Sequence, residues 1–204
     1  MGLHAKRCID ILVASLLLLM LAPVLLWVAW RVRHHLGSPV LFCQTRIGLN
    51  EKPFLLYKFR TMRAGTGDDA ARLHPFGLKL RASSLDELPE LWNILRGDMS
   101  LVGPRPLLPE YLPYYTPSES ARHRMRPGIT GLAQVSGRNA LSWEARLAHD
   151  SRYVQEWRLW KDVVILWRTV LVVLRRDGIS AEGHVTMPRL DVYRQAMKDS
   201  HGSH

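Results

Sequence analysis

Two adjacent carboxylates, Asp86 and Glu87, stand among basic residues in a pattern that could act on a phosphorylated substrate. Arg81 precedes them, and Arg105 follows within the rigid run Gly103-Pro-Arg-Pro106. A carboxylate among arginines stays ionised near neutral pH. It could therefore attack phosphorus or hold a divalent cation, while the arginines neutralise phosphate oxygens. Taken alone, acidic residues at a helix start would only stabilise that helix, by about 0.3–1 kcal/mol.

Other residues extend the same phosphate-binding pattern. Lys58 and Arg60 fall on one face of a predicted strand, because successive side chains of a strand point to opposite faces. Arg126-Pro-Gly-Ile-Thr-Gly131 adds Arg126 and glycine-rich backbone amides of the kind that cradle anions, although without Walker spacing. Asp162 begins a predicted helix and could be a simple cap.

The composition indicates an ordered, basic protein. The chain has 204 residues, of which 47% are hydrophobic, and its net charge is +10. Residues 1–63 hold nine lysines and arginines but only two acidic residues. This balance favours polyanionic partners: an anionic membrane surface, a phosphorylated substrate or nucleic acid. Two cysteines are too few for a disulfide scaffold, and the nine histidines lack metal-ligand spacing.

Periodicity and turn signals predict the secondary structure around these charged residues. Residues 40–47 and 54–59 predict a β-hairpin, and residues 64–75 predict a loop. A helix is expected to begin near Ser84 with a capping box to Glu87, and to end at Gly97.

The second half of the chain is predicted to be largely helical. Prolines make residues 103–117 rigid and irregular, and helices are expected over 118–125, 142–158 and 161–176. The apolar core of the last helix is too short to span a bilayer, so this helix is either a core helix or one that lies at a membrane interface.

An apolar segment occupies residues 11–30, with Ser15 as its only polar residue and Pro23 near its middle. Its length fits a bilayer, and it is too long for a cleaved signal peptide. Basic residues at both ends give no orientation bias for a spanning helix. The proline kinks the helix, so we expect a re-entrant hairpin, with a spanning helix as the alternative.

Together these motifs resemble the bacterial sugar transferase family, and in particular its small monotopic phosphoglycosyl transferases. The resemblance runs from about residue 4 to residue 190. It is carried by the Pro-broken N-terminal segment and by four motifs, Lys58-Phe-Arg-Thr-Met62, Ser84-Leu-Asp-Glu-Leu-Pro89, Gly97-Asp-Met-Ser-Leu-Val-Gly-Pro-Arg-Pro106 and Arg126-Pro-Gly-Ile-Thr-Gly131.

The resemblance implies transfer of a sugar 1-phosphate from a UDP-sugar to undecaprenyl phosphate, with release of UMP, through an aspartyl-phosphosugar intermediate and with Mg²⁺. Asp86 would be the nucleophile, and Glu87 would assist as a metal ligand or proton acceptor. Asp86 and Glu87 would also be the residues that hold Mg²⁺. Lys58, Arg81 and Arg105 would contact phosphates, and Asp162 matches another acidic position associated with the site. Residues 178–188 resemble members that use acetamido sugars such as diacetylbacillosamine.

We therefore expect an α+β, mainly helical fold with a short β-hairpin and interfacial helices. Residues 1–36 would form the re-entrant membrane anchor, 37–190 the catalytic domain and 191–204 a polar tail. The enzyme would work on the cytoplasmic face of the bacterial inner membrane, among membrane lipids, without nucleic acid and with the possibility of a homo-oligomer. Two alternatives stay open: a non-catalytic basic protein that binds nucleic acid or lipid, and a transferase that moves the whole sugar and releases UDP.

Overall fold

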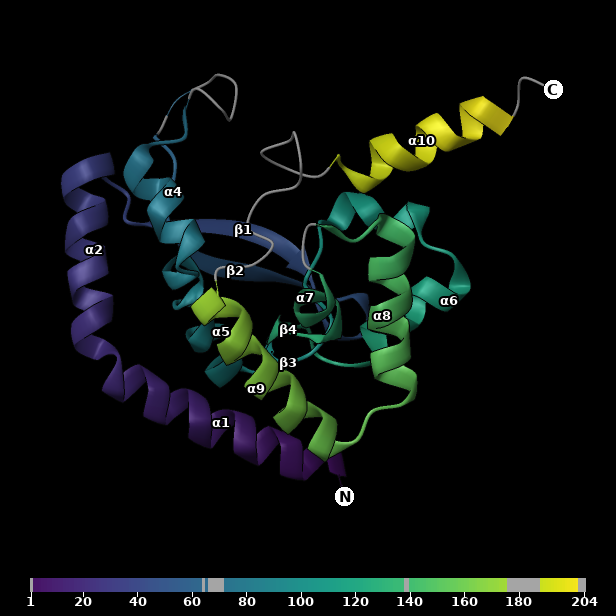
Figure 1. Ribbon diagram of the computed structural model, residues 1–204, viewed down its shortest axis with the longest axis horizontal. Coiled ribbons are helices and arrows are strands. Elements are labelled where there is room, and N and C mark those ends of the chain that lie inside the picture. Colours follow the sequence, from purple (N-terminus) through teal and green to yellow (C-terminus); the bar gives the residue numbers. More distant parts are fainter. Residues whose placement is uncertain (1, 64, 66–71, 138–139, 176–187, 202–204) are drawn as a thin grey trace.

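Residues 2–36 form two helices joined at a sharp bend (Figure 1). The computed structural model describes residues 2–63, 65, 72–137, 140–175 and 188–201. Helix α1 (Gly2–Met20) and helix α2 (Ala22–Leu36) are bent by 63° at a break two residues before Pro23. Among the described residues no single helix is long and apolar enough to cross a membrane, although this bent pair passes that test together.

Helix α1 packs on the rest of the protein through a narrow face. Lys6, Asp10 and Ala14, spaced four residues apart, are buried on one side of the helix. Leucines on the opposite side, such as Leu12 and Leu19, are exposed. Helix α1 therefore packs one face into the core, through Ala14, and leaves its other apolar face exposed.

The predicted hairpin is confirmed. Strands β1 (Leu41–Ile47) and β2 (Pro53–Phe59) pair antiparallel, in the register that opposes Phe42 to Lys58, with the short 3-10 helix η1 (Leu49–Glu51) at the turn. The fully buried Asn93 attaches β2 to the helix behind it. Its Oδ1 accepts from the Tyr57 amide at 3.1 Å, and its Nδ2 donates to the Leu55 carbonyl at 2.7 Å.

The segment that carries Asp86 differs from the predicted helix. Helix α4 (Pro75–Ala82) begins at the last residue of the expected loop. Residues 64 and 66–71 of that loop lie outside the described part. The 3-10 helix η2 (Leu85–Glu87) and helix α5 (Glu90–Arg96) then replace one continuous helix. The capping box is wrong, because Ser84 adopts left-handed backbone (φ 56°) and its side chain caps nothing. Gly97 ends α5 with φ 92°, as expected of a glycine stop.

A second small sheet and a set of helices complete the fold. Strand β3 (Ser100–Val102) runs parallel to β4 (Gly128–Thr130). The predicted helix at 118–125 is divided, because α6 ends at Ser120 and a 3-10 helix follows. The remaining elements are η3 (Pro109–Tyr114), α6 (Pro117–Ser120), η4 (Ala121–Arg124), α7 (Leu132–Ser136), α8 (Trp143–Gln155), α9 (Leu159–Arg175) and α10 (Leu190–His201). The mainly helical α+β class is confirmed.

The main core lies where α1, α5, β3 and α9 meet, around Ile94, Met99 and Ile165. Helix α9 buries one face there and leaves an apolar stripe exposed at helical spacing, made of Trp160, Val163, Trp167, Val170 and Leu174. At the other end of the chain, α10 forms from residues expected to be a polar tail. Leu190 at its start is fully buried in a second cluster with Tyr111 and Trp143.

Candidate active site

Asp86 lies in the turn between α4 and α5 and is the least restrained of the predicted site residues. The residue is only 8% exposed, yet its carboxylate makes no hydrogen bond or ion pair with any described residue. Burial and the adjacent Glu87 charge raise the pKa of Asp86 to about 6, against the opposing pull of Lys58, Arg81 and Arg105. At neutral pH it is therefore a largely ionised, desolvated carboxylate, which is the state needed for nucleophilic attack.

Glu87, its neighbour, is held by two cations. Lys58 Nζ and Arg105 Nη2 each donate to Glu87 Oε1 at 2.7 Å. Although burial opposes ionisation, the charges of Arg105 and Lys58 outweigh it and lower the pKa of Glu87 well below its usual range. The pKa of Arg105 is raised chiefly by Glu87. The two cations are thereby fixed beside Asp86 and remain charged.

A third carboxylate, Glu90, joins this group from the first turn of α5. It is 2% exposed, and Lys58 Nζ lies 3.0 Å from its Oε1 without hydrogen-bond alignment. Burial raises the pKa of Glu90 to about 7, which Lys58 only partly offsets. Its position in Glu90-Leu-Trp resembles an ordinary acidic first turn. Sequence reasoning therefore missed it, although its spacing three residues after Glu87 places both on one helix side.

Arg81 reaches the site from the last turn of α4. Its Nε donates to Thr61 Oγ1 at 3.0 Å, and its charge lowers the pKa of Asp86. Gly77 allows this approach, because a Cβ there would lie 1.8 Å from the Thr61 carbonyl oxygen. The predicted grouping of Lys58, Arg81 and Arg105 around the carboxylates thus appears in the structure.

Arg105 is positioned by the segment that sequence analysis assigned to anion binding. The Gly128 amide donates to the Pro104 carbonyl at 3.0 Å, and a Cβ on Gly128 would lie 2.1 Å from the Gly103 nitrogen. Gly103 and Gly128 thus allow two backbone segments to pack closely. The Gly128 amide already has an acceptor, so the prediction that it helps to bind an anion within residues 126–131 is wrong. From the other side, Arg122 Nη2 donates to the Arg105 carbonyl at 2.6 Å and pairs with the buried Asp150.

Two predicted phosphate contacts lie elsewhere. Arg60 follows the end of β2, and its guanidinium donates to the carbonyls of Leu36, Gly37 and Ser38 at the end of α2. Arg126 Nε donates to the Gly97 carbonyl at 2.9 Å, at the end of α5. Both cations are used to satisfy carbonyls at a helix C-terminus, and the structure does not bring either to the carboxylate group.

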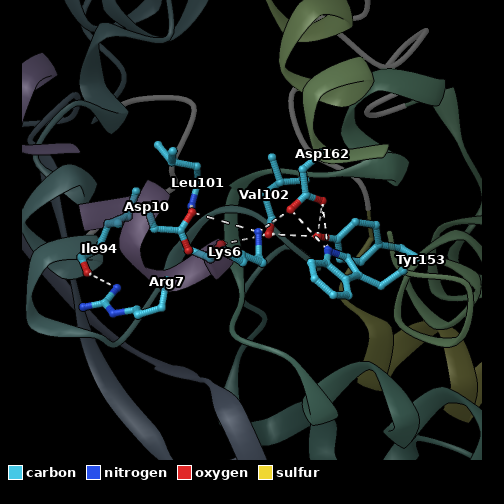
Figure 2. Close-up of polar contacts among 10 residues, drawn as sticks. Lys6, Arg7, Asp10, Ile94, Leu101, Val102, Tyr153 and Asp162 are labelled. Atoms are coloured by element: carbon cyan, nitrogen blue, oxygen red, sulfur yellow. Dashed lines mark hydrogen bonds and ion pairs between the residues drawn. The ribbon is translucent and has the colours of Figure 1, made fainter. Parts of the chain in front are cut away.

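Asp162 belongs to a separate buried cluster (Figure 2). Lys6 Nζ donates to its Oδ2 at 2.6 Å, and the Tyr153 hydroxyl lies 2.7 Å from its Oδ1. Trp157 Nε1 is 3.2 Å from both oxygens. Burial and Asp162 raise the pKa of Tyr153, so its hydroxyl stays protonated. Asp162 thus tethers α1, α8 and α9 to one another. The described part of the structure shows no contact between it and the Asp86–Glu87 group, with which it was predicted to act.

The carboxylates fit the donor set that Mg²⁺ prefers. This ion usually takes one or two protein carboxylates together with substrate phosphates. Asp86 is unpaired, and both cations on Glu87 contact Oε1, which leaves Oε2 without a partner among the described residues. Within that same part of the chain no group of three or more His, Cys, Asp or Glu residues forms a complete metal site. A bound ion would therefore need oxygens of the substrate.

Comparisons with known proteins identify the relatives of the chain. The family described as "Bacterial sugar transferase" matches residues 1–176. The uncharacterized sugar transferase EpsL of Bacillus subtilis is 48% identical over 190 residues, 90% of this chain and 94% of that protein. The UDP-glucose:undecaprenyl-phosphate glucose-1-phosphate transferase of Caulobacter vibrioides is 44% identical, covering 85% of this chain and 71% of its own length.

A third relative is longer than this chain. The undecaprenyl-phosphate galactose phosphotransferase of Salmonella typhimurium is 39% identical over 85% of this chain, which spans only 41% of that protein. The family match covers most of the chain, and EpsL is matched over nearly its whole length. The chain therefore belongs to the bacterial sugar transferase family.

Proposed function

We propose that the protein transfers a sugar 1-phosphate from a UDP-sugar to undecaprenyl phosphate and releases UMP, through a phosphosugar bound to Asp86. The observation that carries this proposal is the contrast between the two adjacent carboxylates. Glu87 is paired with Lys58 and Arg105 through Oε1, whereas Asp86 is buried, largely ionised and without a hydrogen bond or ion pair to any described residue. The names of the Caulobacter and Salmonella relatives support the overall reaction.

In the first step, an Asp86 oxygen attacks the β-phosphorus of the UDP-sugar. The bond from that phosphorus to the bridging oxygen breaks, and UMP leaves with the oxygen. In the second step, a phosphate oxygen of the lipid attacks the same phosphorus, and the Asp86 carboxylate is released. Lys58, Arg81 and Arg105 would stabilise the charge that develops on the phosphoryl oxygens.

Glu87 suits a positioning or metal-binding role better than that of a general base. Its pKa is lowered by Arg105 and Lys58, so it has little affinity for a proton. The acceptor also needs little deprotonation, because a phosphate monoester has a second pKa near 6. When bound at Asp86 and Glu87, Mg²⁺ would neutralise charge on the diphosphate.

The exposed apolar faces support work at a membrane. The outer faces of α1 and α2 and the stripe on α9 are apolar and exposed, and the lipid substrate keeps its phosphate at a bilayer surface. The bend of 63° between α1 and α2 fits a helix pair that enters and leaves one leaflet. We place this leaflet on the cytoplasmic side of the inner membrane, where UDP-sugars are made.

The donor is proposed only as a UDP-sugar, with three candidate sugars. Of the tail at residues 178–188 that resembles acetamido-sugar enzymes, residues 178–187 lie outside the described part. The named relatives act on glucose and galactose, so these sugars stand beside an acetamido sugar as candidates. Membership of a transferase family speaks against the non-catalytic alternative.

The released nucleotide tests the proposal. Detergent-solubilised protein is incubated with Mg²⁺, undecaprenyl phosphate and, separately, UDP-glucose, UDP-galactose, UDP-N-acetylglucosamine and UDP-diacetylbacillosamine. Release of UMP with at least one donor is expected. UDP as the product would indicate transfer of the whole sugar, and no nucleotide with any donor would contradict the proposal.

A further inference from the structure

Arg46 shares the hairpin face that carries Lys58. In the register of the hairpin, Phe42, Gln44 and Arg46 of β1 lie opposite Lys58, Leu56 and Phe54 of β2. Opposed residues of an antiparallel pair point to the same side. Lys58, at one end of this face, contacts Glu87 and Glu90. Arg46 therefore lies on the same face of the hairpin as Lys58, toward its other end.

Arg46 lacks the anionic partner that a half-buried arginine normally has. Its Nη2 donates to Gln44 Oε1 at 2.6 Å, but its Nε is buried and has no acceptor. Within the described part of the chain, no carboxylate lies within ion-pair distance of Arg46. Arg60 also has a buried Nε without an acceptor, but its other guanidinium nitrogens donate to three helix-end carbonyls. Arg126 donates to a helix-end carbonyl, and Arg122 pairs with Asp150. A buried donor left without an acceptor is costly, so such a group indicates a missing ligand.

Arg46 is also close to Arg105. The Ile47 amide donates to the Leu107 carbonyl at 3.1 Å, which sets the end of β1 beside the Pro-Arg-Pro segment. Burial lowers the pKa of Arg46, and the charge of Arg105 lowers it further, whereas smaller contributions from Tyr111, Glu90 and Glu110 raise it. The two guanidinium groups therefore repel each other. Glu87 neutralises Arg105 only in part, because it is shared with Lys58. An anion between the two guanidinium groups would relieve this repulsion.

We infer that Arg46 and Arg105 form a phosphate subsite that holds the phosphate of UMP as it leaves and the phosphate of the lipid as it attacks. The inference rests on the proposed function. In an in-line displacement at phosphorus, Asp86 occupies one apical position, and the leaving oxygen occupies the other. The second displacement must return through that position, so both phosphate monoesters would use one subsite in turn. Arginine suits it, because its planar fork binds phosphate in bidentate fashion.

The test compares Arg46→Gln with Arg46→Lys and with a matched control, Arg152→Gln. Arg152 is exposed and pairs with Glu156 on α8, so its substitution removes the same charge away from the site. Three quantities are measured: inhibition by UMP, inhibition by uridine, and the KM for undecaprenyl phosphate. We expect Arg46→Gln to weaken UMP inhibition and raise the lipid KM by about tenfold or more, the loss of a charge-assisted contact. Uridine inhibition should not change, and Arg46→Lys should restore part of the effect.

Wild-type enzyme that releases no UMP would contradict the proposed function itself. If the wild type turns over, Arg46→Gln with unchanged UMP inhibition and lipid KM would overturn only this inference. If only UMP inhibition or only the KM for undecaprenyl phosphate changed, the two phosphates would not share one subsite, and the inference would be overturned. Thermal unfolding of each variant establishes that it is folded, and Arg46→Lys provides the readout if Arg46→Gln does not fold.

Discussion

Lys6 in α1 and Asp162 in α9 form a buried ion pair across 156 residues, with 2.6 Å between Nζ and Oδ2. Both side chains are less than a tenth exposed, and Tyr153 and Trp157 complete the contacts of the carboxylate. Asp10, one turn further along α1, accepts from the Leu101 amide of β3 at 3.1 Å (Figure 2). These contacts join a helix with an exposed apolar face to the strand that leads to Arg105.

Removing one partner of this pair should destabilise the protein strongly. Lys6→Met leaves Asp162 buried without its cation, and we expect a loss of about 3–5 kcal/mol in the free energy of unfolding. The double variant Lys6→Met with Asp162→Leu should recover part of this loss, because neither charge is then left unpaired. Denaturant unfolding in detergent measures both. If Lys6→Met alone were as stable as the wild type, the Lys6–Asp162 ion pair would not hold α1 to α9.

Glu87→Gln should impair turnover while preserving the fold. The amide cannot hold Lys58 and Arg105 as an ion pair, so we expect a fall of about 10²-fold or more in kcat/KM. A raised Mg²⁺ requirement would identify Glu87 as a metal ligand, and a raised KM for UDP-sugar at unchanged Mg²⁺ dependence would identify it as a positioning residue. Turnover within twofold of wild type would remove Glu87 from the site.

The first half-reaction should depend on pH through Asp86. Its pKa is raised to about 6 by burial and by Glu87, and only the ionised form can attack. The rate of UMP release without acceptor should therefore be nearly full at pH 7.5 and fall to about one tenth at pH 5. This half-reaction is chosen because the lipid phosphate, which titrates in the same range, is absent. An unchanged rate between these pH values would contradict the assignment.

The sequence predicted the residues of the site better than their contacts. The alternating hairpin and the Asp86, Glu87, Lys58 and Arg105 group follow from local patterns and from the family resemblance. The roles of Arg60 and Arg126 could not be read in this way, because the carbonyls that they satisfy belong to helices distant in sequence. The local sequence likewise favoured a capping box at Ser84, but the left-handed backbone of this residue does not place its side chain to cap the helix.

Residues missed altogether share one feature. Lys6, Arg46 and Arg122 each look like ordinary basic residues, and their significance lies in partners or repulsions set by the tertiary fold. Helix α10 was also missed, because its sequence is largely polar and gives little sign that Leu190 is buried. A buried charge can be recognised only when its surroundings are known.

The proposed re-entrant topology predicts that both ends of the α1–α2 pair face the cytoplasm. Cys8 and Cys43 are exposed and would themselves react, so both are first replaced by serine. Cysteines placed at Gly2 and at Ser38 should then both be labelled by a reagent confined to the cytoplasmic side. Pro23→Leu should move the pair toward a span, because the ring and its missing amide no longer favour the break. Labelling of position 2 only from the periplasm in the unmodified helix would favour a spanning segment.

The most direct test of the account is the intact mass of the protein after exposure to UDP-sugar and Mg²⁺ without lipid acceptor. A phosphosugar carried on Asp86 should give an added mass of one sugar phosphate and up to one UMP per active site, and the adduct should be lost when undecaprenyl phosphate is supplied. Asp86→Asn keeps the shape of the side chain but removes its anionic oxygen, so it should abolish the adduct and turnover together. Substantial turnover by folded Asp86→Asn, or an adduct mapped to another residue, would contradict the assignment of Asp86 as the nucleophile.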